Sequence, residues 1–182
     1  MSAIPTYEDI ARFHGHTCPG LALGYRVALA ALGALGADRA LDEELVAVVD
    51  NDSCAVDAIQ VVLGCTFGKG NLIHRDYGKH VYTIYRRDHG SGVRVSLALE
   101  EEPREMSREQ RECLILTAPQ DALLCVEPAE GPVPERAQTE PSEPCDACGQ
   151  LTMCSRLVEV EGSLLCRPCA ERATTSSGNP RR

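Results

Sequence analysis

The sequence predicts an α+β protein, with a small mixed sheet packed against helices and a separate four-cysteine zinc ribbon near the C-terminus. Three observations support this prediction. Helical and strand-like hydrophobic patterns follow one another up to residue 126 without the regular alternation of a parallel α/β fold. A stretch rich in proline and glutamate comes next, at residues 128–144. Two paired-cysteine motifs then stand seventeen residues apart, Cys145-x-x-Cys148 and Cys166-x-x-Cys169.

The first half of the main domain is predicted as helix, helix, strand and helix, at residues 6–13, 19–35, 45–49 and 53–63. Thr6 and Ser53 stand where a side-chain oxygen can cap the first turn of a helix. Pro19 suits the first turn of the long helix, because the N–H that proline lacks would have no partner there. The apolar run at 45–49 is short, which favours a strand.

The second half is predicted as two strands, a helix and a last strand, at residues 80–86, 93–99, 107–116 and 122–126. The two strands alternate apolar and polar residues, and residues 88–92 form a glycine-containing turn between them. Ser107 and Gln110 form the capping-box pattern at the start of the helix. This order of elements, with no internal repeat, indicates α+β.

The chain is predicted to divide into a main domain, a linker, a zinc ribbon and a disordered tail, at residues 1–127, 128–144, 145–170 and 171–182. The linker carries five prolines and four glutamates, with Val133 as its sizeable apolar residue. Such a segment cannot bury enough apolar surface to fold, so we expect it to be extended. The polar tail is expected to fray.

Composition limits the classes of function. With 182 residues, 43% of them hydrophobic, the chain suits one main domain and a small appendage. A net charge of −9 argues against general nucleic-acid binding through a basic surface. We find no membrane-span pattern and no secretory signal. Ten cysteines without such a signal indicate a reducing compartment, so we expect a cytoplasmic protein whose cysteines are ligands, reactive thiols or core residues.

The paired cysteines near the C-terminus predict a structural zinc site. Each pair bends two thiolates toward one point, and four thiolates complete a tetrahedral shell around Zn²⁺. The predicted ligands are Cys145, Cys148, Cys166 and Cys169. An unrelated set of cysteines is the alternative, which the spacing disfavours. Cys113 and Cys125 lie among apolar residues and are expected in the core.

The segment His14-Gly-His16-Thr-Cys18 is the first candidate site in the main domain. It places three good metal ligands two residues apart, just before the long helix. In extended backbone, alternate residues point to the same side. Cys18 would also lie at a helix N-terminus, where the helix dipole favours the thiolate. The alternative is a set of ordinary polar residues.

The segment from Asp50 to Asp57 is the second candidate. It follows a strand and opens a helix, and it contains Cys54 in the expected first turn, where the thiol pKa should be lowered. Asp57 stands three residues after Cys54 and so shares its helix face. The alternative is that Asp50, Asp52 and Ser53 only cap the helix.

A glycine-rich loop at residues 64–71 is the third candidate. It departs from the Walker pattern, because Gly70 stands where Ser or Thr should coordinate Mg²⁺. Its backbone N–H groups and Lys69 could still bind an anionic ligand or cofactor. The alternative is a plain turn.

At these motifs the chain resembles the FmdE family of formylmethanofuran dehydrogenase components. The strings HGHTCPGLALGYR, NDSCAVDAIQVVLGCTFGKGNL and RDYGKHVYTIYRR carry the resemblance, over about residues 10–127. It implies a core related to the second domain of glyceraldehyde-3-phosphate dehydrogenase, a homodimer, and zinc or another transition metal near the motif residues. The implied core-site residues are His16, Cys18, Cys54 and Cys65. Whether His14 joins them is left open.

Two hypotheses for function follow. The first is a metal-binding accessory, subunit or regulatory protein associated with molybdenum or tungsten enzymes, whose ribbon docks a partner protein. The alternative is a zinc-dependent enzyme with an open metal position. In it, Asp57 or His14 would act as the base, and Lys69 would bind a small anionic substrate. Nucleic-acid binding through arginines of the ribbon is disfavoured by the acidic composition.

Overall fold

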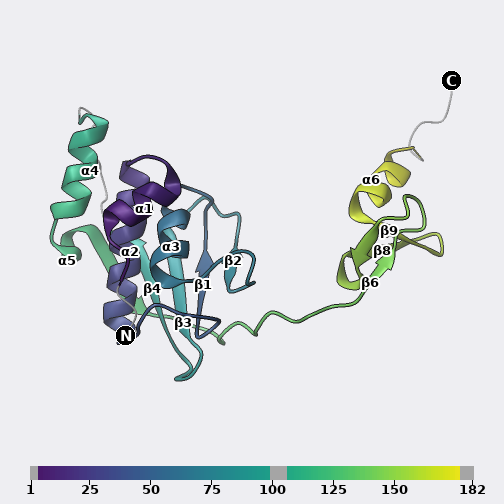
Figure 1. Ribbon diagram of the computed structural model, residues 1–182, viewed down its shortest axis with the longest axis horizontal. Helices are drawn as coiled ribbons and strands as arrows, with labels where there is room; N and C mark the ends of the chain where they lie inside the picture. The colour runs from purple at the N-terminus through teal and green to yellow at the C-terminus, as the bar shows by residue number, and fades with distance from the viewer. Residues whose placement is uncertain (1–3, 99–105, 177–182) are drawn as a thin grey trace. The chain divides into compact units, whose positions relative to one another are not determined.

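A computed structural model describes residues 4–98 and 106–176, and the chain divides into two compact units, residues 1–137 and 138–182. In the first unit a five-stranded sheet has the order β2-β1-β3-β4-β5. Its strands are β1 (Leu45–Val49), β2 (Leu72–His74), β3 (Val81–Arg86), β4 (Ser91–Leu97) and β5 (Leu124–Pro128). β1 and β2 are parallel and the other pairs are antiparallel, which confirms the mixed α+β prediction (Figure 1).

The helices of the first unit pack on each other and on the sheet (Figure 1). They are α1 (Tyr7–His14), α2 (Pro19–Leu35), α3 (Ala55–Leu63), α4 (Arg108–Thr117) and α5 (Gln120–Leu123). Thr6 caps α1 and Ser107 caps α4, as predicted, and both helices begin with a complete capping box. Arg26 of α2 donates to the carbonyl oxygens of Ile115 and Ala118, at 2.6 and 2.7 Å, and so ties α4 to the core.

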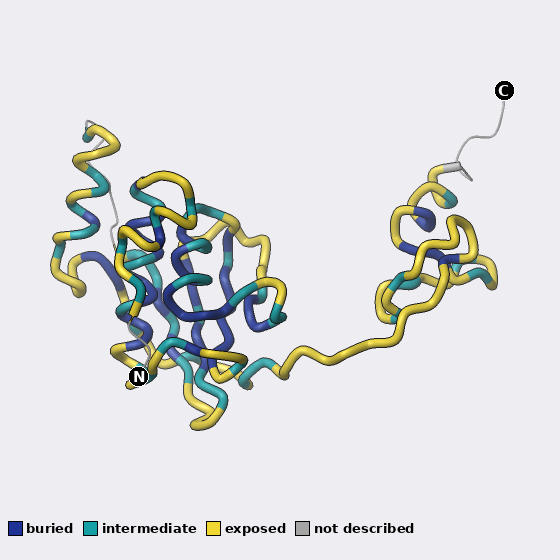
Figure 2. Tube along the Cα trace, in the orientation of Figure 1, coloured by how far each residue is buried: buried dark blue, intermediate teal, exposed yellow. Residues whose placement is uncertain are grey.

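Burial explains how the sheet is oriented. β1 is buried along its whole length (Figure 2). Leu45, Ala47 and Val49 belong to the main core with the helices. Val46 and Val48 belong to a smaller cluster with Tyr85. Because side chains alternate along a strand, β1 separates these two clusters.

The start of the proline-rich segment differs from the prediction, because it packs against the sheet instead of forming a free linker. Ala129 and Val133 pack against the small cluster around Tyr85. The Tyr85 hydroxyl donates to the carbonyl oxygen of Glu130 at 3.1 Å. Arg87 donates to two further carbonyl oxygens of the segment. Backbone carbonyls accept these hydrogen bonds, so the polar side-chain composition of the segment does not reveal them.

The second unit is a small module of two hairpins and a helix. Its elements are β6 (Ser142–Pro144), β7 (Leu151–Met153), η1 (Cys154–Arg156), β8 (Leu157–Val160), β9 (Ser163–Cys166) and α6 (Arg167–Ser176). α6 therefore extends as a regular helix into the segment that the sequence predicted as a disordered tail, while residues 177–182 lie outside the described residues.

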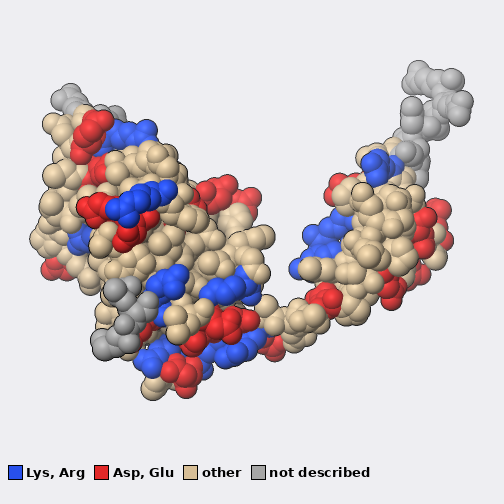
Figure 3. All heavy atoms as spheres, in the orientation of Figure 1, with Lys and Arg blue, Asp and Glu red and all other residues tan. Residues whose placement is uncertain are grey.

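Charged side chains of both signs are interspersed over the face of the first unit shown in Figure 3. Arg86 pairs with Asp88 at 2.8 Å, and Arg94 pairs with Glu127 at 3.3 Å. These two arginines are therefore engaged locally. None of the helices in residues 4–98 and 106–176 combines the length and the apolar character that a membrane span needs.

Helices α2 and α3 pack closely at Gly24. A Cβ atom on Gly24 would lie 2.2 Å from the carbonyl oxygen of Ala55. Backbone atoms cannot yield at such a distance without moving a helix. The two helices therefore require a residue without a side chain at this position.

We predict that Gly24→Ala lowers the free energy of unfolding by about 1–3 kcal/mol, because the added methyl group forces α2 and α3 apart. The matched control is Gly33→Ala in the same helix, where a Cβ meets nothing within 4 Å. That change should raise stability by about 0.5–1 kcal/mol through helix propensity. Urea unfolding followed by circular dichroism measures both, and equal effects of the two substitutions would contradict the close-packing account.

Candidate functional site

The loop between α1 and α2 gathers three potential metal ligands. His14 ends α1, and Gly15 follows in the left-handed conformation with φ 93°. Cys18 is the N-cap of α2, where its sulfur accepts a hydrogen bond from the Leu21 N–H at 3.3 Å. His14, His16 and Cys18 each offer a ligand atom, and these atoms lie within 4.8 Å of one another. The structure thus adds His14, which the sequence left open, to the group.

A carboxylate fixes the orientation of His14. Nδ1 of His14 lies 2.6 Å from Oδ2 of Asp57, which stands in the first turn of α3. With the imidazole proton on Nδ1, the carboxylate accepts a hydrogen bond from the Nδ1–H group, and the lone pair lies on Nε2. Nε2 is buried and has no hydrogen-bond partner among the described residues. A buried nitrogen with a free lone pair is what a metal ligand requires.

Cys54 lies beside Cys18, although its thiol differs from the prediction. Burial, and then the hydrogen bond and charge interaction with Cys18, raise the pKa of Cys54 instead of lowering it. Cys54 makes no side-chain capping bond to α3. The helix N-terminus would lower the pKa of this thiol, but removal from water and the neighbouring thiol of Cys18 raise it by more.

Helix α4 contacts the other side of this loop. Arg108 lies with one guanidinium nitrogen 3.3 Å from Nε2 of His16. The Tyr7 hydroxyl donates to Glu112 at 2.9 Å and, more weakly, to the carbonyl oxygen of Cys18 at 3.4 Å. Burial, and then the bond to Glu112, raise the pKa of Tyr7. A metal ion at Nε2 of His16 would take the lone pair that Arg108 uses, so the two contacts exclude each other.

The donor set fits a transition metal. Two imidazoles and a thiolate suit zinc and its neighbours in the periodic table better than magnesium or calcium, which prefer oxygen ligands. The pairing of His14 with Asp57 is the arrangement that commonly orients a metal-bound histidine. Cys54 lies beside Cys18 as a further thiol.

The structure does not bring Cys65 to this cluster. Cys54 precedes α3 and Cys65 follows it, so a nine-residue helix separates them, which corresponds to roughly 13 Å. Cys65 is fully buried, and burial raises the pKa of its thiol to about 12. Cys65 is thus placed as a core residue.

Lys69 is also placed away from the cluster. Its Nζ donates to the carbonyl oxygen of Asp42 at 2.7 Å. It is absent from the described residues that line a cavity beside the cluster, between α3, the end of β1 and β2. The prediction that Lys69 binds an anionic ligand there is therefore not supported by its position.

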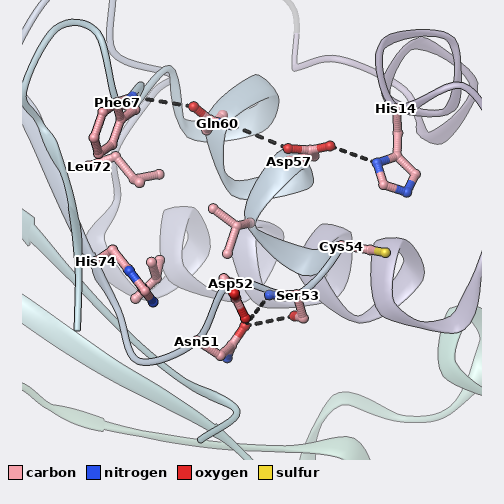
Figure 4. A pocket seen from close by; sticks show the side chains of 12 residues that line it. His14, Asn51, Asp52, Ser53, Cys54, Asp57, Gln60, Phe67, Leu72 and His74 are labelled. Atoms are coloured by element: carbon pink, nitrogen blue, oxygen red, sulfur yellow. Dashed lines mark hydrogen bonds and ion pairs between the residues drawn. The ribbon is translucent and has the colours of Figure 1, made fainter. Parts of the chain in front are cut away.

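A cavity of about 380 Å³ adjoins the cluster, between α3, the end of β1 and β2. Val49, Val56, Phe67 and Leu72 contribute apolar walls. Figure 4 shows Phe67 and Leu72 on one side of it, with His14 on the other. The cavity is large enough for a small organic molecule beside the metal ligands.

Sequence reasoning missed several residues of this cavity. It gives His74 no role, and it does not single out Gln60 or Phe67. The element β2, which carries His74, is three residues long and gives no alternating pattern. Its position beside β1 depends on parallel pairing, which a local pattern does not reveal.

The second unit holds a separate cluster of four cysteines, as predicted. The sulfur atoms of Cys145, Cys148, Cys166 and Cys169 lie within 4.8 Å of one another. The backbone N–H of Cys166 donates to the sulfur of Cys145, and this bond lowers the pKa of Cys145 to about 6. The thiolate is therefore favoured at neutral pH. The four thiols could hold one metal ion, and Cys154 lies outside their group.

Comparison with known proteins places these sites in context. Residues 13–123 match the family FmdE, described as "Molybdenum formylmethanofuran dehydrogenase operon". A protein of Archaeoglobus fulgidus named "Probable S-adenosyl-L-methionine-binding protein" is 31% identical over 189 aligned positions, covering 87% of this chain and 50% of that protein. The chain thus spans about half the length of this relative.

Among solved structures, a tungsten formylmethanofuran dehydrogenase FmdE-like protein from Syntrophus aciditrophicus has a TM-score of 0.68 with this chain. The two are 21% identical, and the match covers 100% of both chains. At this identity the likeness shows a shared fold.

We predict that Cys65 resists alkylation by iodoacetamide in the native chain at pH 8. With its pKa raised to about 12, only about one thiol in ten thousand is ionised, and burial blocks access. Cys113 and Cys125 are exposed, contrary to the core positions expected from sequence, and serve as internal controls that should react readily. Peptide mass spectrometry measures each site. Labelling of Cys65 at the rate of the controls would contradict its placement.

Proposed function

The chain belongs to the FmdE family, and from that premise we propose that it is a metal-binding accessory protein associated with molybdenum or tungsten enzymes. The observation that carries the proposal is the cluster of His14, His16 and Cys18, with Asp57 orienting His14. Zinc or another transition metal would be held there, with Cys54 as an additional thiol. A metal at this site would supply Lewis acidity or a docking point for a ligand.

The second unit supports a docking role. We propose that zinc bound by its four cysteines stabilises the module, as in other small ribbons. Leu151 and Met153 are exposed on β7, by 76% and 57%. Exposed apolar side chains of this kind suit contact with a partner protein. A homodimer remains our proposal from the family resemblance, and a cytoplasmic location remains our proposal from the ten cysteines.

A zinc-dependent enzyme is the second candidate, favoured by the cavity next to the cluster. In that case His14 and Asp57 would be tied to each other, so neither is free to act as an independent base. Lys69 gives no support for an anionic substrate, because it bonds to Asp42 instead. The name of the Archaeoglobus fulgidus relative makes S-adenosyl-L-methionine a candidate occupant.

We predict that the full chain, purified without added chelator, carries two metal ions. Replacing Cys145 and Cys166 by serine should remove the ribbon ion alone. Replacing His14 by alanine and Cys18 by serine should remove the core ion alone, since the two clusters lie in different units. Inductively coupled plasma mass spectrometry measures the stoichiometry. A single ion that is lost only with the ribbon cysteines would refute the core site.

We further predict that Asp57→Asn weakens metal affinity at the core site by about 10–100-fold, because an amide no longer holds His14 in the right tautomer. The matched control is Asp121→Asn on α5, a carboxylate that contacts only the adjacent Ala122 N–H within the described residues. Competition with a chromophoric chelator measures the affinity of the core site in chains lacking the ribbon cysteines. Unchanged affinity in Asp57→Asn would show that the carboxylate does not support the metal.

A further inference from the structure

The cavity beside the metal cluster has a chemical character of its own. Its apolar walls come from Val49, Val56, Phe67 and Leu72. Phe67 is 75% exposed, so its ring is available to a ligand. A molecule with a flat apolar body would cover this ring and bury the wall.

Most polar groups of the cavity are already bonded within the protein. The Asn51 amide accepts from Ser53 and donates to Lys79 and Tyr82, so it shapes the turn after β1. Gln60 bridges Asp57 and the Phe67 backbone. These groups fix the shape of the cavity and leave little capacity for a ligand.

Two side chains at the cavity remain uncommitted. Asp52 and His74 both line it, and within the described part of the chain neither makes a hydrogen bond or an ion pair. Asp52 is exposed to solvent. Figure 4 shows Asp52 beside Asn51 and Ser53, apart from His14.

The charge balance at the cavity favours one class of ligand. Asp52 and Asp57 contribute two carboxylates, and no lysine or arginine is among the described residues that line it. An anionic ligand would face these carboxylates without a fixed cation from the protein. A cation, by contrast, would meet the uncommitted, exposed Asp52 with its charge and the apolar wall with its body.

We propose that this cavity binds a small organic cation, with an apolar or aromatic body against Phe67 and Leu72 and its positive group at Asp52. The ligand would lie beside the core metal. The proposal therefore rests on the proposed function only for the presence of that metal next to the cavity. Asp52 determines specificity for charge. This assignment reverses the anionic substrate expected from sequence.

Three molecules that share a benzyl or phenyl ring test the proposal: benzylamine, benzyl alcohol and benzoate. Each is titrated into the ¹⁵N-labelled, metal-replete full chain at pH 7, and backbone amide shifts are followed at Phe67, Leu72 and His74. These three residues line the cavity and His16 does not, so benzoate that binds only the metal near His16 is not scored as cavity binding. Benzylamine should bind there about tenfold more tightly than benzoate, because Asp52 attracts one and repels the other across solvent.

Asp52→Asn should bring the ratio of the two dissociation constants close to one and leave benzyl alcohol unaffected. Asp121→Asn, remote on α5, should preserve the ratio. Benzoate binding at least as tightly as benzylamine, absence of shifts with benzylamine, or an unchanged ratio in Asp52→Asn would each overturn the proposal. Metal content measured on the same samples separates the cation-binding proposal from the proposed function. If the chain prefers benzylamine over benzoate but holds no core metal, only the proposed function is refuted.

Discussion

The close approach of α2 to α3 is the constraint on which the candidate site depends. Gly24 allows the helices to meet, because any side chain there would collide with the backbone of Ala55. One turn earlier, a Cβ on Gly20 would lie 3.2 Å from Cβ of Cys54. The starts of the two helices are therefore held together. As a result Cys18 meets Cys54, and Asp57 reaches His14.

The two ring nitrogens of His14 have different roles. Nδ1 pairs with the Asp57 carboxylate, and Nε2 is buried without a hydrogen-bond partner among the described residues, as a metal ligand requires. Its Asp57 partner is thereby removed from other chemistry, which leaves Asp52 as the carboxylate available to a ligand at the cavity. Metal binding and ligand binding thus use different acidic residues. Asp52 precedes α3 and Asp57 lies within it, so this one short segment could serve both metal binding and ligand binding.

The sequence predicted what depends on local spacing. His14, His16 and Cys18 are close in the chain, so their clustering followed from the motif, and the paired cysteines of the ribbon did likewise. The family resemblance groups Cys65 with them, whereas the structure places Cys65 in the core after α3, because a resemblance marks a position without saying which end of α3 faces the loop. The contact of Asp57 with His14 joins residues 43 apart and required the helix packing. The raised pKa of Cys54 likewise depends on burial, which spacing does not show.

The central claim is that imidazole and thiolate groups of the α1–α2 loop hold a metal ion. X-ray absorption at the edge of the retained metal tests it most directly, on full chain in which serine replaces Cys145 and Cys166. The account predicts a mixed first shell, which for zinc would show nitrogen at about 2.0–2.1 Å and sulfur at about 2.3 Å. A shell of sulfur alone, or one of oxygen and nitrogen without sulfur, would contradict it.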